Sequence, residues 1–263
     1  MSRSNGYIIG FAAAVCVVCS LFVSGAAVSL KSRQDLNKVI DRQKNVLSVA
    51  DAEKFTTDAL KGMTPDEVDQ AFNDGIRARI VNLKTGEYVD DVNGQGPKDY
   101  DQQRALLDPS LSEDAPEGNM AKVQRVPHHA VVYQVVENDQ VTTLILPVEG
   151  KGLWSTLYGF IALDKDTTTI KGLTFYQHAE TPGLGGEVDN PTWKAKWPGK
   201  KAFDEQWEPK VNVAKSVSRD PVYQVDGLSG ATLTSRGVTY LLQFWLGDDA
   251  FGPYLDNFRK TGA

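Results

Sequence analysis

A gap in the charge distribution near the N-terminus constrains this chain more than any other feature. The sequence contains 28 Lys and Arg and 34 Asp and Glu residues, yet none of them lies between Arg3 and Lys31. Inside this gap, residues 7–28 form a run of 22 mostly apolar residues. A helix of about 20 apolar residues spans the hydrocarbon core of a bilayer, because its backbone polar groups pair with one another. The gap therefore predicts one membrane-spanning helix.

Two interpretations of this apolar run compete. A cleaved signal peptide has a shorter apolar stretch, of about 7–15 residues, followed by small residues at the cleavage site. Gly25, Ala26 and Ala27 supply small residues, but the run is longer than that range. We therefore expect an uncleaved anchor over residues 1–30, followed by one soluble domain over residues 31–263.

The charges that flank the run do not settle its orientation. Arg3 precedes it, whereas a group of basic residues follows it: Lys31, Arg33, Lys38, Arg42 and Lys44. Counted alone, this excess places the following domain in the cytoplasm by the positive-inside rule. Long domains cross the membrane largely regardless of such charges, so the residues leave the side of the membrane open.

The chain has two cysteines, Cys16 and Cys19, and both lie inside the apolar run. Residues three apart share a helix face, so a redox pair or half of a metal site is geometrically possible. Because the chain has no second pair, we favour two small apolar residues that pack in lipid, and we assign no metal site. The run also lacks the ionisable residues that ion pathways through membranes need, so this helix alone conducts no ions.

The remaining residues have the composition of an ordinary globular domain. The chain is 41% hydrophobic with a net charge of −6, which argues against a nucleic-acid partner held by a basic surface. Apolar residues spaced three or four apart predict an amphipathic helix over residues 36–50. Thr64, Pro65 and Glu67 mark the start of another helix through a capping box. The expected buried face of that helix consists of three apolar residues: Val68, Phe72 and Ile76.

Short runs rich in β-branched and aromatic residues predict an antiparallel sheet. Residues 80–83 and 87–89 form an expected hairpin, and a meander of strands covers residues 131–137, 141–147, 157–163 and 169–177. We expect loops with one short helix over residues 90–118, and a last strand over residues 211–217. The fold class is therefore α+β: a single N-terminal transmembrane helix, then one soluble domain with an antiparallel sheet and flanking helices.

The densest motif lies at residues 226–237, Asp-Gly-Leu-Ser-Gly-Ala-Thr-Leu-Thr-Ser-Arg-Gly, directly before an apolar helical pattern. A helix start offers unpaired backbone N–H groups and the positive end of the helix dipole, which suits a phosphate. The alternative is that Thr234 or Ser235 simply caps the helix. From the residues alone, both interpretations stay open.

Two further segments combine glycine with residues that contact flat ligands. Residues 178–187, His-Ala-Glu-Thr-Pro-Gly-Leu-Gly-Gly-Glu, follow a predicted strand, and their glycine spacing differs from the dinucleotide fingerprint. A Pro-Gly turn lets the backbone approach a ligand closely, although a tight surface loop has the same composition. Residues 150–155, Gly-Lys-Gly-Leu-Trp-Ser, form a turn that presents an aliphatic and an aromatic side chain.

Together these three segments resemble the family of covalent FMN-binding domains, and within it the C-subunit family of the Na+-translocating NADH:quinone reductases. The resemblance rests on Gly-Leu-Trp at 152–154, His-x-Glu-Thr-Pro-Gly-Leu-Gly at 178–185 and Asp-x-x-Ser-Gly-Ala-Thr at 226–232. An N-terminal span before such a domain belongs to the same pattern, so the resemblance covers nearly the whole chain.

The resemblance implies a site. FMN is then esterified through its phosphate to the threonine of the Ser-Gly-Ala-Thr motif, Thr232, by a flavin transferase that uses FAD as donor. The other implied cofactor-binding residues of this motif are Asp226, Ser229, Gly230, Ala231, Leu233 and Thr234. The candidates for contacts with the flavin ring are Leu153, Trp154, Glu180, Thr181, Leu184 and Gly185. A one-electron carrier needs no general base, so no catalytic residue is assigned and His178 is expected to be structural.

The resemblance also implies a function: electron transfer within a bacterial inner-membrane complex that oxidises NADH, reduces ubiquinone and exports Na+. The implied partners are the other subunits and the flavin transferase, and the soluble domain is expected in the periplasm. Two alternatives remain, the homologous FMN-carrying component (G) of a ferredoxin:NAD+ oxidoreductase complex and a membrane-anchored binding module without cofactor. The Pro-Trp-rich residues 190–197 favour the quinone reductase.

Overall fold

The computed structural model describes residues 4–52, 54–214 and 220–261. Within it the chain forms two compact units, Met1–Arg42 and Gln43–Ala263. The first helix, α1 (Asn5–Ala50), is 46 residues long and continues from the first unit into the second. The second unit contains a mixed arrangement of antiparallel strands and helices, which agrees with the expected α+β class.

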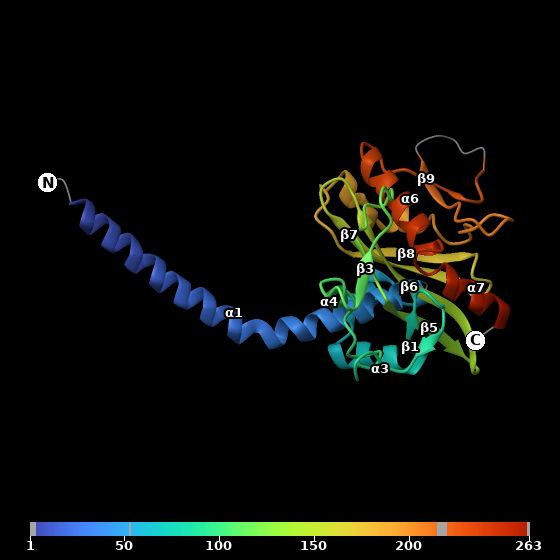
Figure 1. The fold of residues 1–263 in the computed structure, drawn as a ribbon, viewed down its shortest axis with the longest axis horizontal. Helices are drawn as coiled ribbons and strands as arrows, with labels where there is room; N and C mark the ends of the chain where they lie inside the picture. The colour runs from blue at the N-terminus through green and yellow to red at the C-terminus, as the bar shows by residue number, and fades with distance from the viewer. Residues whose placement is uncertain (1–3, 53, 215–219, 262–263) are drawn as a thin grey trace. The chain divides into compact units, whose positions relative to one another are not determined.

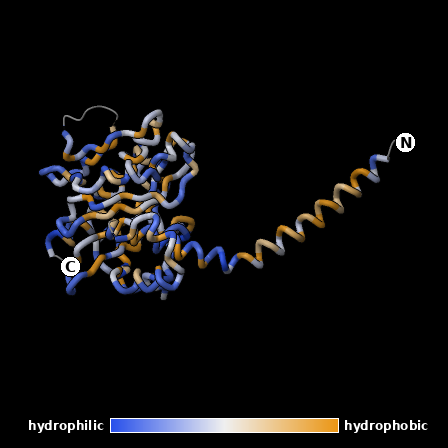
Figure 2. Tube along the Cα trace, turned by 180° about the vertical axis from the view of Figure 1, so that it is seen from behind, coloured by the Kyte–Doolittle hydropathy of each residue, from blue (hydrophilic) through white to orange (hydrophobic). Residues whose placement is uncertain are grey.

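The N-terminal part of α1 is long and apolar enough to cross a membrane. Its apolar stretch and the polar turns that follow it are seen in Figure 2. The amphipathic helix predicted over residues 36–50 is a continuation of this same helix. Its apolar face is buried only near the end, at Val46, Leu47 and Val49, whereas Leu36 and Val39 are exposed. The predicted helix is therefore present, and its apolar face packs on the second unit only at its end.

A six-stranded sheet forms the centre of the second unit, with the strand order β2-β1-β5-β6-β7-β8 (Figure 1). All neighbouring strands in it are antiparallel, which confirms the expected hairpin and meander. The bounds of its strands are β1 (Ile76–Asn82), β2 (Tyr88–Val89), β5 (His129–Glu137), β6 (Gln140–Lys151), β7 (Thr156–Asp164) and β8 (Ile170–Gln177).

Strand β6 is longer than the sequence suggested. The sequence predicts strands over residues 141–147 and 157–163, with a small-residue turn at residues 150–155 between them. In the structure β6 pairs with β5 only as far as Ile145, while its pairing with β7 continues to Lys151. Pro147 therefore lies in the part of β6 that pairs with β7 alone, opposite Phe160.

The predicted helix start at Thr64 is present as α3 (Pro65–Gly75), with both hydrogen bonds of the capping box between Thr64 and Glu67. Val68 and Phe72 are buried as expected. Ile76 is also buried, but it lies in the sheet as the first residue of β1, so its assignment to the helix face is wrong. The helix ends one residue earlier because the backbone turns extended at this position.

Helices cover both faces of the sheet. The helix α6 (Thr232–Leu246) packs on the face that carries Gly150, where Leu241 contacts the strand. The register of β6, β7 and β8 places Gly172 on the opposite face, and there Val49 of α1 packs against it. The core therefore lies in two layers, one under α6 and one under the end of α1 (Figure 1).

Shorter elements surround the sheet. Residues 90–118 are mainly loops with one short helix, as expected, and they also contain one short strand. The remaining bounds are α2 (Thr57–Gly62), α4 (Gln102–Ala105), β3 (Ser112–Asp114), β4 (Arg125–Pro127), η1 (Gly185–Asp189), α5 (Pro191–Lys194), β9 (Asn212–Ala214), β10 (Gln224–Asp226) and α7 (Gly252–Thr261). The strand expected over 211–217 is present as β9, and residues 215–217 of that prediction lie outside the described residues.

Candidate functional site

The three segments singled out from the sequence meet around one buried carboxylate, that of Glu180. We call them the turn segment (150–155, from the end of β6 to the start of β7), the glycine segment (178–187, after β8) and the hydroxyl segment (226–237, from β10 into α6). Glu180 belongs to the glycine segment and is only 5% exposed. It accepts hydrogen bonds from both other segments, so one side chain connects all three.

The turn segment donates several hydrogen bonds to this carboxylate. The backbone N–H of Trp154 lies 2.9 Å from Glu180 Oε1, and that of Ser155 lies 3.1 Å from the same oxygen. The N–H of Leu153 donates to Oε2 at 3.2 Å. From the hydroxyl segment, Thr234 Oγ1 donates to Oε2 at 2.6 Å. Both carboxylate oxygens are thus bonded to protein donors.

These contacts also set the ionisation of Glu180. Burial on its own raises the pKa of a carboxyl, because it penalises the charged form. The hydrogen bonds from the Thr234 hydroxyl and the backbone N–H groups of the turn segment lower it, and together they outweigh burial. The pKa of Glu180 is therefore held below its usual value of 4.5, and the group is an anion at neutral pH.

Helix α6 begins without a side-chain cap. Its N-cap residue is Ala231, and no side chain in the described part of the chain accepts a hydrogen bond from the first turn. Ser235 Oγ instead accepts from Leu228 N–H and donates to the Ala231 carbonyl, while Thr234 donates to Glu180. The alternative that Thr234 or Ser235 caps the helix is therefore wrong. Among the described residues, the N–H groups of residues 232–234 have no hydrogen-bond acceptor, so the helix start is open to an anion.

The four hydroxyl side chains of the hydroxyl segment differ in accessibility. Thr234 and Ser235 are buried and hydrogen-bonded, at 0% and 4% exposure. Ser229 and Thr232 are exposed. Thr232 is also the first residue of α6, so its hydroxyl lies at the open helix start. Among these residues, Thr232 alone combines an accessible hydroxyl with that position.

Exposed apolar side chains from all three segments accompany this helix start. Leu153 and Trp154 are 43% and 69% exposed, and Leu184 and Leu233 are 45% and 54% exposed. Leu184 lies beside the hydroxyl segment, since a Cβ added to Gly230 would be 3.0 Å from Leu184 Cδ2. Leu233 follows Thr232 directly on α6. Such an arrangement fits a ligand with an anionic group at the helix start and a flat apolar part beside it.

The glycines bring the segments close together. A Cβ on Gly185 would be 2.6 Å from both Glu180 Oε2 and Thr234 Oγ1, so no larger residue fits there. Gly230 has a positive φ of 70°, a conformation that glycine adopts without strain. Ala231 is buried beneath the helix start, and Thr181 is exposed in the glycine segment. The structure thus places the sequence-predicted residues within these three adjoining segments.

Residues that sequence reasoning missed hold the beginning of the hydroxyl segment. The indole Nε1 of Trp193 donates to the Asp226 carbonyl at 2.9 Å, and Lys196 Nζ lies 3.0 Å from Asp226 Oδ2. Trp193 in turn packs edge-on against Trp197, with ring centroids 5.4 Å apart. The unusual Pro-Trp-rich composition of 190–197 is the signal that could have indicated this role. Ser155 was also missed, although its hydroxyl accepts from Ala179 N–H.

His178 lies at the edge of the site and is fully engaged with protein groups. Its Nδ1 accepts from Glu180 N–H at 3.2 Å, so its Nε2 carries the proton that is donated to Asp189 at 2.8 Å. The arrangement agrees with the structural role expected from the sequence, because neither ring nitrogen is left for proton transfer.

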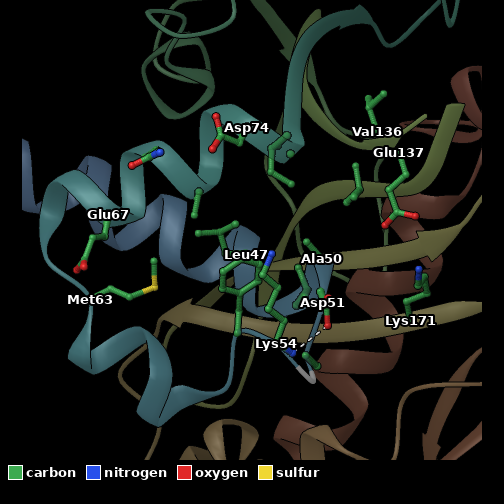
Figure 3. Close-up of a pocket in the computed structure, with 18 of the residues that line it drawn as sticks. Leu47, Ala50, Asp51, Lys54, Met63, Glu67, Asp74, Val136, Glu137 and Lys171 are labelled. Carbon is green, nitrogen blue, oxygen red and sulfur yellow. Dashed lines mark hydrogen bonds between the residues drawn. The ribbon is translucent and has the colours of Figure 1, made fainter. Parts of the chain in front are cut away.

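A separate cavity of about 770 Å³ lies between the end of α1, α3 and the ends of β5 and β8 (Figure 3). Asp51, Lys54 and Lys171 contribute charged groups to its lining. None of the residues predicted for the site lines it. The cavity is therefore distinct from the arrangement around Glu180 and Thr232.

Comparison with known proteins identifies this arrangement. The family model described as FMN-binding domain matches residues 152–247. The NqrC protein of the Na+-translocating NADH-quinone reductase of Pseudomonas aeruginosa is 47% identical over 255 residues, covering 95% of this chain and 94% of that protein. The corresponding protein of Vibrio parahaemolyticus is 40% identical, covering 100% and 97%. A crystal structure of Shewanella oneidensis NqrC superposes with a TM-score of 0.75 at 32% identity, covering 86% of this chain and 100% of that chain.

The matched residues 152–247 contain the open helix start and the apolar side chains around it, so the soluble unit is an FMN-binding domain, preceded by a helix long enough to cross a membrane. The similarity to the relatives extends over nearly the full length of both partners. The chain belongs to the NqrC family, whose members are subunits of Na+-translocating NADH-quinone reductases.

Proposed function

We propose that this chain carries FMN linked through its phosphate to Thr232, and that it passes electrons within a membrane complex that oxidises NADH, reduces ubiquinone and exports Na+. The observation that carries the proposal is the exposed hydroxyl of Thr232 at the uncapped start of α6. The names of its relatives, subunits of Na+-translocating NADH-quinone reductases, support the reaction of the whole complex.

The geometry favours Thr232 over the other hydroxyls. In the transfer reaction the Thr232 oxygen forms a bond to the FMN phosphorus of FAD, the pyrophosphate bond breaks, AMP leaves and the hydroxyl proton is released. A flavin transferase reaches an exposed hydroxyl, whereas Thr234 and Ser235 are buried. The resulting phosphodiester keeps one negative charge, which the free N–H groups of the first turn of α6 stabilise. Ser229 is exposed but lies before the helix.

The same arrangement accommodates the rest of the cofactor. The N–H groups of residues 232–234 would hold the phosphate, and Gly230 would keep the approach to it open. Leu153, Trp154, Leu184 and Leu233 would contact the faces of the flavin ring, since all four are exposed beside the helix start. When bound, FMN supplies one-electron redox chemistry, while the protein supplies its position and surroundings. Linkage through the phosphate leaves the ring free to react.

We propose residues 1–30 as the membrane anchor and residues 31–263 as the FMN-binding domain, held at the bacterial inner membrane with the domain in the periplasm. The apolar part of α1 supports the anchor. Protease added to intact spheroplasts tests the side: a periplasmic domain is digested, whereas a cytoplasmic domain is cut only after lysis. Protection of the domain in intact spheroplasts would overturn the periplasmic placement.

Denaturing electrophoresis tests the covalent link. The chain, expressed with a flavin transferase, is expected to give a fluorescent band that Thr232→Ala abolishes. Ser229→Ala is the matched control, because it removes the other exposed hydroxyl of the same segment, and its band is expected to remain. A fluorescent Thr232→Ala band would overturn the assignment of the residue. A colourless wild-type protein would overturn the flavin itself.

A further inference from the structure

Among the buried charged groups described in the second unit, the carboxylate of Glu180 accepts the most hydrogen bonds. Burying an anion is costly unless several donors compensate for the lost water. Here the compensation comes from the N–H groups of residues 153–155 and the hydroxyl of Thr234. These donors lie 25 to 54 residues away along the chain, so the carboxylate joins distant segments.

We propose that Glu180 is the positioning residue of the cofactor site: its carboxylate holds the turn segment against the start of α6 and thereby sets where Thr232, Leu153 and Trp154 lie. This inference rests on the proposed function in so far as Thr232 is the attachment point. Glu180 acts through Thr234 and through the backbone of the turn segment.

The division of donors supports this role. Glu180 uses the side-chain hydroxyl of Thr234 and takes none of the backbone N–H groups of α6. The first turn of the helix therefore stays available for a phosphate, although an anion already lies beside it. In the turn segment, by contrast, the donors are backbone groups: three consecutive N–H groups donate to the carboxylate. The backbone of Leu153 and Trp154 is thereby fixed, while their side chains remain exposed.

Two glycines leave the room that the Glu180 carboxylate occupies. A Cβ at Gly152 would be 2.6 Å from Glu180 Oε1, and a Cβ at Gly185 would be 2.6 Å from Oε2. The carboxylate thus fills the space between two glycines on different segments. Both oxygens accept from protein donors, and an amide of the same shape would replace one acceptor oxygen by an NH₂ donor group. Glu180→Gln therefore removes the negative charge and one of the two acceptor atoms with little change in volume.

Hydrogen exchange tests this geometry directly. It is measured on the full chain in detergent without flavin, comparing wild type, Glu180→Gln and Glu137→Gln, an exposed glutamate at the far end of β5. In Glu180→Gln, exchange at the N–H groups of residues 153–155 is expected to rise at least about tenfold, as for loss of charge-assisted hydrogen bonds. In Glu137→Gln it is expected to stay unchanged. Unchanged exchange in Glu180→Gln would overturn the proposal.

Two substitutions at Thr234 test the same proposal if Glu180→Gln does not fold. Thr234→Val removes one donor to the carboxylate, and Thr234→Ser restores it. The initial rate of flavin attachment, with purified transferase and FAD, is expected to fall about tenfold in Thr234→Val and to recover in Thr234→Ser. Equal rates in the two variants would overturn the positioning role. Absence of attachment in wild type would overturn the proposed function, while the exchange result would still decide the role of Glu180.

Discussion

Gly237 lies directly against the turn segment: a Cβ at this position would overlap the carbonyl oxygen of Lys151. Helix α6 therefore approaches the end of β6 more closely than any residue with a side chain would allow. Gly237 lies in the second turn of α6, five residues after Thr232, so this contact fixes the distance between the start of the helix and the sheet. The close approach explains why a glycine stands in the middle of a helix despite its unfavourable helix propensity.

Gly237→Ala is accordingly expected to destabilise the domain by about 1–3 kcal/mol, because the helix must shift away from the turn segment. Urea unfolding of the full chain in detergent, followed by far-UV circular dichroism, measures the change. The matched control is Gly62→Ala, at the end of α2, where a Cβ would have no atom within 4 Å. There we expect no loss of stability, and a gain of up to about 1 kcal/mol. Equal effects at both positions would contradict the close-contact argument.

The acid stability of the domain is expected to depend on Glu180. Its pKa in the folded protein lies below the value of 4.5 expected when unfolded. The unfolded state therefore binds the proton more tightly, and the stabilisation is present above pH 4.5 and lost as the pH falls through the folded pKa. The difference in unfolding free energy between wild type and Thr234→Val is expected to be largest near pH 6–7 and to shrink below pH 4.5. A difference that grows on acidification would refute this assignment.

The pKa of Glu149 is shifted in the opposite direction to that of Glu180. Burial raises its pKa to about 7, above its usual value of 4.5. The folded state then binds the proton more tightly, so the contribution of Glu149 to stability is fully present below pH 4.5 and is lost as the pH rises through about 7. Glu149→Gln removes this penalty. It is expected to stabilise the domain by on the order of 1–3 kcal/mol at pH 8 and to have little effect at pH 4.5.

Thermal unfolding of wild type and Glu149→Gln at several pH values between 4.5 and 8 tests this expectation. Glu137→Gln is the control, since its side chain is exposed on the adjacent strand β5. We expect its stability to follow that of wild type at each pH. A wild-type protein that gains stability relative to Glu149→Gln above pH 7 would show that the charged form of Glu149 has a favourable partner.

Much of this architecture could be predicted from local patterns. The capping box of α3 is complete within four residues, from Thr64 to Glu67, and the strands of the meander follow β-branched runs between turn residues. Such patterns involve residues that are close together in the sequence, so they can be recognised without the structure. The errors occurred at boundaries, as at Ile76 and after Pro147, where pairing with a distant strand decides the outcome.

The sequence predicted which segments form the candidate site, but not the hydrogen bonds that join these segments. The motifs indicated which segments matter, and the open start of α6 agrees with the phosphate interpretation. The hydrogen bond between Thr234 and Glu180 joins residues 54 apart, and no periodicity or spacing encodes such a pairing. The same holds for Trp193 and Asp226, which are 33 residues apart. These contacts depend on how the sheet and α6 bring the segments together.

Substitution by phenylalanine is expected to lower the stability of the domain at one tryptophan, Trp193, and to leave it almost unchanged at another, Trp154. Trp193 is 6% exposed, and its indole N–H donates to the Asp226 carbonyl. Trp193→Phe leaves that carbonyl without its partner and is expected to cost about 1–2 kcal/mol of stability. Trp154 is 69% exposed, so Trp154→Phe is expected to change stability by less than about 0.5 kcal/mol.

The absorption spectrum of the attached flavin distinguishes the same two variants in a second way. Trp154→Phe is expected to shift the flavin absorption spectrum, because we propose that this side chain contacts the ring, whereas Trp193→Phe leaves the spectrum of the attached flavin unchanged. Urea unfolding and absorption spectra of both variants, taken on the same preparations, separate the two roles. If Trp154→Phe left the flavin spectrum unaltered, the proposed ring contact would be wrong. If Trp193→Phe were as stable as wild type, its hydrogen bond to Asp226 would not support the start of the hydroxyl segment.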